Sequence, residues 1–244
     1  PGGQRTPGQR ERYRRQLALP QSGPAGQRRL EEGRVLVIGA GGVGSPCALY
    51  LAAAGVGTIG IADGDRVELS NLQRQLLYTT AELGRPKAEA AAAALETLNP
   101  WVTIRPYPRY LTGKEVLDLA GEYDFIIDAA DGLAAKLAIA DACAAAGRPC
   151  CHGGVGGFLG QVTTCLPEDG NCYRCIFGTA RGDSPAGGTL GPACGVAGSV
   201  MAAEAVKYLT GAGELLARRM LSVDLLRGRM ETVAFCKKRN DSTL

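Results

Sequence analysis

The chain has 244 residues, of which 45% are hydrophobic and 21% are charged, so it can bury one substantial core. Its net charge of +3 comes mostly from arginines among the first thirty residues, which argues against a nucleic-acid-binding field over the whole molecule. No apolar run reaches the roughly 18 residues of a membrane helix, and the first residues lack the apolar segment of a signal peptide. We therefore expect a cytoplasmic protein without a membrane or nucleic-acid partner.

The first 33 residues are predicted to form a basic arm that precedes the main domain. Residues 1–9 are expected to be a disordered leader, residues 10–19 a short helix, and residues 20–26 a linker rich in Pro and Gly. Residues 34–244 are then expected to form a single nucleotide-binding domain.

From residue 34 onward, apolar strand-like segments alternate with alanine-rich helical segments. The predicted strands cover residues 35–38, 58–62, 102–105 and 125–129. The predicted helices start at Ser45 and cover residues 86–98, 114–120 and 133–146. This alternation predicts an α/β fold with a Rossmann-like, doubly wound, mostly parallel sheet.

After residue 150 the chain becomes rich in glycine. We expect a crossover loop over about residues 176–192 and a helix over residues 195–209. Two strands, 220–225 and 230–235, flank a short turn and are predicted to extend the sheet as an antiparallel hairpin.

Nine cysteines in a chain without an export signal are better explained as thiols, metal ligands or core residues than as a disulfide framework. Cys47 and Cys143 lie in alanine-rich helical stretches, so we expect both in the core.

A glycine-rich segment, with Gly39, Gly41, Gly42 and Gly44, follows the first predicted strand and opens a helix. Its backbone N–H groups and the helix dipole can meet a phosphate. Asp63 lies 24 residues after Gly39, at the end of the next strand, where a carboxylate can accept both ribose hydroxyls. Together they predict nucleotide binding, and on their own they leave a dinucleotide-dependent oxidoreductase open.

Further polar residues follow the strands at the same predicted edge. Arg74 lies in a polar segment where a nicotinamide enzyme needs no arginine, and Lys87 lies in the first turn of a helix, where a cation is unfavourable unless an anion is close. Asp128 and Asp131 close an apolar strand, at a place where a carboxylate can hold Mg²⁺. Taken alone, each of these residues would be interpreted as a surface charge. The shared location of all four at the ends of strands favours a phosphate-rich ligand.

These segments resemble, in order and spacing, the ThiF/MoeB/HesA family, the bacterial relatives of ubiquitin-activating enzyme. The resemblance covers about residues 10–240 and includes Cys172-Tyr-Arg-Cys175 and the Gly-Val-Ala-Gly-Ser run at 195–199. It implies ATP-dependent adenylation of the C-terminal carboxylate of a small ubiquitin-like sulfur-carrier protein that ends in Gly-Gly. The ATP-binding positions that it implies are Gly39, Gly41, Gly42, Gly44, Asp63, Asp65, Asn71, Arg74, Gln75, Lys87 and Asp131.

The resemblance also implies a role for each key side chain. Asp63 would bind ribose, Arg74 and Lys87 the ATP phosphates, and Asp131 Mg²⁺, while Arg15 would enter the partner subunit's active site in a homodimer. Arg74, Lys87, Asp131 and Arg15 are thus the candidate catalytic residues. A separate donor protein would supply the sulfur.

The reaction needs no general base, because a C-terminal carboxylate is already ionised at pH 7 and can attack the α-phosphorus of ATP directly. Positioning and charge neutralisation are sufficient. The single histidine, His152, is therefore expected to pack rather than to act in catalysis.

The chain departs from the family at its metal motif. Cys172 and Cys175 resemble half of a structural zinc site, which normally needs a second cysteine pair. The family places that pair just after the last strand, where this chain has Cys236 alone and no cysteine in residues 239–244. Either the chain has been cut or altered, or the metal has been lost, and zinc binding stays open.

Two further departures concern the loop and the metal-binding turn. Ser184 occupies the place where several relatives carry a reactive cysteine, and Cys194 is the nearby thiol, at a predicted helix N-terminus whose dipole would lower its pKa. Gly132 follows Asp131 where the family commonly has asparagine. Two alternatives to adenylation remain, an NAD-linked oxidoreductase and a catalytically silent nucleotide-binding scaffold.

Overall fold

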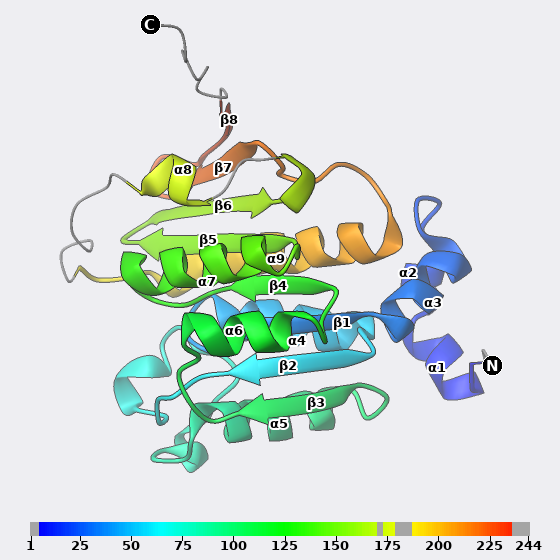
Figure 1. The fold of residues 1–244 in the computed structure, drawn as a ribbon. Coiled ribbons are helices and arrows are strands. Elements are labelled where there is room, and N and C mark those ends of the chain that lie inside the picture. The colour runs from blue at the N-terminus through cyan, green and yellow to red at the C-terminus, as the bar shows by residue number, and fades with distance from the viewer. Residues whose placement is uncertain (1–4, 170–172, 179–186, 236–244) are drawn as a thin grey trace, which may run out of the picture.

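The computed structural model describes residues 5–169, 173–178 and 187–235, which form a twisted sheet with helices on both faces (Figure 1). The strand order is β3-β2-β1-β4-β5-β6-β7-β8. Neighbouring strands from β3 to β5 are parallel, and those from β5 to β8 are antiparallel. The predicted fold class, a mostly parallel Rossmann-like sheet with an antiparallel extension, is confirmed.

The elements follow the predicted alternation closely. The strands are β1 Arg34–Ile38, β2 Thr58–Ala62, β3 Thr103–Tyr107, β4 Phe125–Asp128, β5 Cys150–Gly156, β6 Leu159–Cys165, β7 Arg219–Asp224 and β8 Arg229–Ala234. The helices are α1 Pro7–Arg12, α2 Arg14–Leu17, α3 Gly23–Glu32, α4 Gly44–Ala54, α5 Lys87–Leu98, α6 Gly113–Ala120, α7 Leu133–Ala145, α8 Tyr173–Phe177 and α9 Gly191–Thr210, with short 3₁₀ turns η1 Leu69–Asn71, η2 Thr80–Glu82 and η3 Pro167–Asp169.

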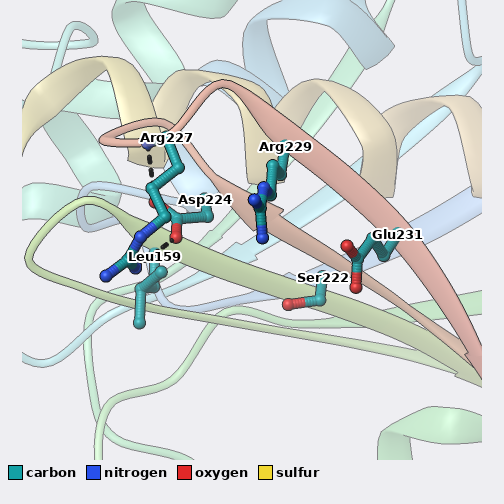
Figure 2. Close-up of a pocket in the computed structure, with 6 residues that line it drawn as sticks. All are labelled: Leu159, Ser222, Asp224, Arg227, Arg229 and Glu231. Atoms are coloured by element: carbon teal, nitrogen blue, oxygen red, sulfur yellow. Dashed lines mark hydrogen bonds and ion pairs between the residues drawn. The ribbon is translucent and has the colours of Figure 1, made fainter.

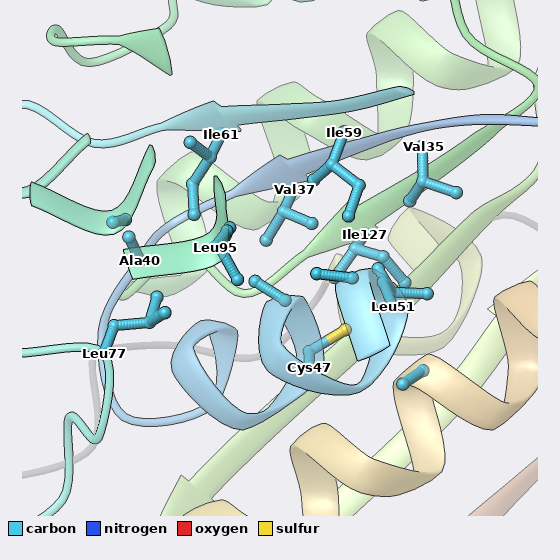
Figure 3. Packing of buried hydrophobic residues seen from close by; sticks show 14 of the residues in the cluster. Val35, Val37, Ala40, Cys47, Leu51, Ile59, Ile61, Leu77, Leu95 and Ile127 are labelled. Carbon is cyan, nitrogen blue, oxygen red and sulfur yellow. The ribbon is translucent and has the colours of Figure 1, made fainter. Parts of the chain in front are cut away.

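The central parallel strands β1, β2 and β4 are mostly apolar and buried because both faces of the sheet are covered there. Val35 and Val37 of β1 pack in the layer that contains α4, α5 and α9, as Figure 3 shows, whereas Leu36 and Ile38 pack in the layer that contains α6 and α7. Cys47 lies in the first layer and Cys143 in the second, so their prediction as core residues is confirmed.

The amino-terminal arm is more regular than the sequence predicted. Residues 7–9 belong to α1 rather than to a disordered leader, because Thr6 and Gln9 form a capping box at its start. Helix α3 begins at Gly23, inside the predicted linker, with Pro24 in its first turn. Both predictions were wrong because they weighed Pro and Gly as breakers and overlooked their preference for helix starts.

The arm packs at the amino ends of the parallel strands, on the right of Figure 1. Tyr13 is buried, and its hydroxyl accepts a hydrogen bond from Asn99 Nδ2 at 2.8 Å. Gln16 and Gln27 both donate to the carbonyl of Ala54, at the end of α4. The division into an arm and a separate domain from residue 34 stays a prediction.

Helix α9 begins at Gly191, four residues before its predicted start, because Pro192 fits the first helical turn. It packs against α4, β5 and β6. Among the residues that the structure describes, no helix combines the length and apolarity needed to cross a bilayer.

A buried carboxylate fastens α9 to the antiparallel strands. Glu204 is 1% exposed, and its Oε2 accepts hydrogen bonds from the Thr164 hydroxyl at 2.6 Å and from the Leu216 N–H at 2.7 Å. Lys207 forms an ion pair with the other oxygen. A carboxylate this deeply buried requires such partners.

Replacing Glu204 by alanine should lower the free energy of unfolding by about 2–4 kcal/mol, because a hydroxyl and an N–H group would lose their acceptor. Urea unfolding followed by circular dichroism measures this change. Glu214→Ala is the matched control, since the Glu214 side chain is 84% exposed and its ion pair should contribute less than about 1 kcal/mol. Equal losses in the two variants would contradict the role assigned to Glu204.

Candidate functional site

The candidate site lies at the carboxyl ends of the parallel strands, where the chain leaves β1 toward β2 and leaves β4 toward β5. Such a reversal of strand order opens a crevice in which ligands bind. The Gly39 N–H donates to the carbonyl of Ala62 at the end of β2, and the Ala129 N–H donates to the carbonyl of Ile38 at the end of β1, both at 2.8 Å. Three strand ends are thus joined.

The glycine loop fits its place only because it lacks side chains. Gly39 has φ +96°, and a Cβ there would lie 2.5 Å from the Ala129 carbonyl oxygen. A Cβ on Gly44 would lie 1.8 Å from the Gly39 oxygen, and one on Gly42 would lie 2.8 Å from Cys194 Sγ. The loop is therefore wedged between the β4–α7 turn and α9, directly before α4 begins.

Asp63 fixes the loop from the side of β2. Its Oδ2 accepts a hydrogen bond from the Ala40 N–H and its Oδ1 one from the Asp65 N–H, both at 2.8 Å. Each oxygen keeps a further lone pair that a ribose hydroxyl can use. Tyr78, which the sequence reasoning missed, donates its hydroxyl to the Ala40 carbonyl at 2.9 Å, and burial raises the pKa of Tyr78, so the phenol stays protonated.

Lys87 was expected to be a surface charge at a helix end, but the structure buries it. It is 5% exposed, and its Nζ lies 3.0 Å from Asp65 Oδ2. The hydroxyl of Tyr110 donates to the other Asp65 oxygen, and this bond, ahead of Lys87, lowers the pKa of the Asp65 carboxyl. The anion that the helix position requires is therefore a carboxylate of the chain itself.

The polar segment after η1 lies against the glycine loop. A Cβ on Gly42 would be 3.3 Å from both Cγ and Cδ of Arg74, and one on Gly41 would be 3.7 Å from Gln75 Nε2. Gln75 is 3% exposed, and its Oε1 is buried without a hydrogen-bond partner in the described part of the chain. Asn71 shapes the segment, since its Oδ1 accepts from the Glu68 N–H at 3.2 Å.

Asp131 lies on the turn between β4 and α7 and is exposed. Its Oδ1 accepts a hydrogen bond from the Gly132 N–H at 2.9 Å, and Gly132 has φ +81°, a conformation that suits glycine. A single exposed carboxylate beside a phosphate site fits Mg²⁺, which typically takes one or two carboxylates and completes its shell with phosphates and water.

Behind this turn lies a charged cluster that the sequence reasoning had not assembled. Asp128 is fully buried, with its Oδ2 2.7 Å from His152 Nδ1 and 3.4 Å from Lys136 Nζ. The expectation that His152 packs is confirmed by its 2% exposure. The available signal was Lys136, a lysine in the first part of a mostly apolar helix, four residues after the 129–132 turn.

Arg15 is exposed on α2, in the arm at the amino ends of the strands. The glycine loop joins the carboxyl end of β1 to α4, at the other end of the strands from the arm (Figure 1), and Arg74 lies against this loop. The structure therefore does not bring Arg15 together with the other candidate residues of the same chain.

The described residues do not supply a zinc site. Cys175 is exposed on α8, while Cys172, Cys236 and Ser184 lie outside the described residues. Within the described ranges, no group of three or more His, Cys, Asp or Glu side chains is placed to hold a metal. No step of the chemistry is assigned to zinc.

Cys194 does not lie at the N-terminus of a helix, where the sequence predicted it. Because α9 starts at Gly191, Cys194 is in the helix and 1% exposed rather than at its tip. Burial raises the pKa of the thiol, although the nearby Arg74 opposes this. The prediction of a lowered pKa was wrong, whereas the alternative expectation from the sequence, that a cysteine in a Gly-Pro-Ala-Cys-Gly turn packs rather than reacts, is confirmed by its burial.

A second hollow, of about 230 Å³, lies on the antiparallel extension (Figure 2). Arg227 pairs with Asp224 across 2.9 Å, and Arg229 and Glu231 extend from β8 above Ser222. Two positive and two negative side chains leave the hollow without a net charge that would select an ionic ligand.

Residues 13–244 match the model of the ThiF family. The chain belongs to the ThiF family. It is 44% identical to a sulfur carrier protein adenylyltransferase of Thermus thermophilus, over 88% of this chain and 83% of the relative. It is 41% identical to the SAMP-activating enzyme E1 of Haloferax volcanii, over 93% of this chain and 86% of the relative.

The ThiF-family chain also matches longer relatives and solved structures. It is 42% identical to the adenylyltransferase and sulfurtransferase MOCS3 of Arabidopsis thaliana over 93% of its own length, and it spans about half, 50%, of that relative. The crystal structure of PaaA shares the fold, with a TM-score of 0.81, 26% identity and coverage of 96% of this chain and 75% of PaaA. MccB of E. coli with ATP has a TM-score of 0.75, 21% identity and coverage of 89% and 68%.

The buried Cys194 thiol should resist alkylation. In the folded protein at pH 7.5, iodoacetamide should modify Cys194 at least about tenfold more slowly than in urea-unfolded protein, because the thiolate is the reacting species and burial disfavours it. Peptide mass spectrometry measures the time course, with the unfolded chain as the control. Equal rates in the two states would show that Cys194 is a reactive thiol.

Proposed function

We propose that this chain adenylates the C-terminal carboxylate of a small ubiquitin-like sulfur-carrier protein, consuming ATP and releasing pyrophosphate. Adenylation of a sulfur carrier is the activity predicted from the sequence, and the family match and the relatives from Thermus and Haloferax confirm it. The Gly-Gly end of the carrier, a cytoplasmic location and a separate sulfur donor complete the proposal.

The placement of Arg74 carries this proposal. Its aliphatic carbons lie against Gly42 of the phosphate loop, so its guanidinium belongs to the surroundings of a bound phosphate. The guanidinium donates to the Ser70 carbonyl at 3.0 Å, and a carbonyl leaves its positive charge uncompensated. A nicotinamide-dependent oxidoreductase has no use for this charge, which disfavours that alternative.

The residues at the site suit a displacement at the α-phosphorus. The carrier carboxylate is ionised at neutral pH and attacks without a base. Arg74 and Lys87 stabilise the negative charge that builds up on the phosphates as pyrophosphate leaves, and Asp63 orients the nucleotide through its ribose. Asp131 would hold Mg²⁺, which supplies further charge neutralisation when bound. Gln75 offers the ligand its buried Oε1, which has no hydrogen-bond partner among the residues that the structure describes.

Arg15 completes the site from a partner subunit in this proposal. Its exposed position in the arm, at the sheet edge opposite its own chain's glycine loop, is consistent with action in a second copy of the chain. A homodimer would then have two composite sites. The silent-scaffold alternative predicts no turnover at either of them.

Lys87→Ala and Asp131→Ala should each lower carrier-dependent exchange of pyrophosphate into ATP by about 100-fold or more, because each removes a charge from the phosphate site. Exchange of labelled pyrophosphate with the isolated carrier measures this. Lys114→Ala and Asp118→Ala, which change exposed residues on α6, are matched controls that should keep full activity. Since Lys87 is buried, circular dichroism must show a folded variant.

Exchange retained within about threefold, a loss below roughly 0.7 kcal/mol of transition-state stabilisation, would refute the roles of these residues. Absence of exchange in the wild-type protein with every carrier tested would instead favour the silent scaffold.

Mixing Arg15→Ala protein with Lys87→Ala protein should restore part of the exchange activity. Some mixed dimers would contain one site with both residues intact, which neither variant has alone. Activity is measured after subunit exchange, which fluorescence energy transfer between labelled subunits verifies. If subunits exchange and the activity of the mixture stays at the level of the separate variants, Arg15 does not act across the interface.

A further inference from the structure

The cluster behind the metal-binding turn is built from three elements. Asp128 is the last residue of β4, Lys136 lies in α7, and His152 lies in β5. Lys136 Nζ also donates to the Gly153 carbonyl at 2.6 Å, so its ammonium ties α7 to β5. Burial alone would raise the pKa of Asp128, but Lys136 and then His152 outweigh it and hold the pKa below its ordinary value. Asp128 is thus a carboxylate.

The same carboxylate shapes the turn that bears Asp131. Asp128 Oδ1 accepts a hydrogen bond from the Ala130 N–H at 3.1 Å, which folds the chain back directly after β4. At the other end of the turn, the Gly132 carbonyl accepts the backbone N–H of Lys136 in the first turn of α7. The Lys136 side chain in turn holds α7 against Asp128 and Gly153. The 129–132 turn is therefore bounded by Asp128 of the cluster and by the start of α7, and the exposed carboxylate of Asp131 lies between them.

The turn is also in contact with the phosphate loop. The space where a Cβ of Gly39 would lie is bordered by the Ala129 carbonyl at 2.5 Å and by the Ala130 nitrogen at 3.0 Å. A shift of the turn by a few tenths of an ångström would therefore alter both the position of Asp131 and the glycine loop.

Burying the charged side chains of this cluster in the core costs desolvation free energy. Buried ion pairs are often no more stabilising than apolar side chains of the same volume. His152 adds to this cost, because its Nδ1–H donates to Asp128 while its buried Nε2 has no partner among the described residues. His152 is one of the residues that line a cavity of about 30 Å³, and the centroid of its ring lies 4.3 Å from that of Tyr173 of α8, on which it stacks. Stability alone does not account for such an arrangement.

We propose that Asp128, Lys136 and His152 are positioning residues that hold the 129–132 turn so that Asp131 meets the metal bound to the nucleotide. This inference rests on the proposed function, in which Asp131 binds Mg²⁺. The three residues act on the metal through Asp131 and contact neither the metal nor ATP.

A double-mutant cycle tests the inference on the full chain. Calorimetry measures the affinity for a non-hydrolysable ATP analogue, with Mg²⁺ and with EDTA, in the wild-type and Asp131→Ala backgrounds. Lys136→Met and His152→Ala should each weaken Mg²⁺-dependent binding by about tenfold, as loss of a residue that orients a metal ligand does. In the Asp131→Ala background the same changes should have less than about a threefold effect, because coupled residues are not additive.

Two control variants separate positioning from folding. His152→Asn places an amide donor near the position of Nδ1. Its affinity for the ATP analogue with Mg²⁺ should therefore stay within about threefold of the wild-type value. Thr164→Val removes a buried hydrogen bond to Glu204 on the α9 side of the sheet, so it should lower stability without changing Mg²⁺-dependent binding.

The inference would be overturned if Lys136→Met and His152→Ala weakened binding of the ATP analogue equally in the wild-type and Asp131→Ala backgrounds. It would also be overturned if they weakened this binding equally with Mg²⁺ and with EDTA. If Lys136→Met fails to fold, the comparison of His152→Ala with His152→Asn decides it. A wild-type chain without Mg²⁺-dependent nucleotide binding would refute the proposed function instead, so the two failures are distinguishable.

Discussion

The close approach of Gly39 to Ala129 is the constraint on which the site depends. A backbone carbonyl lies where a side chain would begin, so the loop after β1 and the turn after β4 can meet only through glycine. This contact joins the two strand ends at the point where strand order reverses. The phosphate loop and the carboxylate of Asp131 are thereby placed on neighbouring segments, although about ninety residues separate them in sequence.

Two lysines at the carboxyl ends of the strands are paired with carboxylates of the chain itself. Lys87 is buried against Asp65, and Lys136 is buried against Asp128. A buried ammonium without a partner would be strongly unfavourable, so these carboxylates let cations remain in the interior of the protein. A phosphate that approaches Lys87 must share it with Asp65, and that exchange is one way to make binding selective for a highly charged group.

The sequence predicted the class of sheet, the alternation of strands and helices as far as α7, the final hairpin and the family, because each depends on local patterns. It gave no bounds for β5, β6 or α8. Apolar runs of four or five residues, helix starts and the glycine loop are all readable within short windows. The burial of Lys87 and the cluster around Asp128 were not readable, since both depend on which side chains meet after folding. The start of α9 was missed because Pro192 looked like part of a loop, and that error also misplaced Cys194.

The charge balance of the site gives a physical reason for a second subunit. A triphosphate brought next to an ionised carboxylate concentrates several negative charges in one crevice. Of the candidate phosphate-binding cations among the described residues, Lys87 is already paired with Asp65, whereas Arg74 donates to a carbonyl and keeps its charge. The single positive charge of Arg74 offsets only part of the negative charge of the triphosphate and the carboxylate. Asp131 adds a further negative charge unless a metal neutralises it. An exposed arginine such as Arg15, carried on an arm that its own chain holds at the far edge, would supply the missing cation at the moment two chains associate.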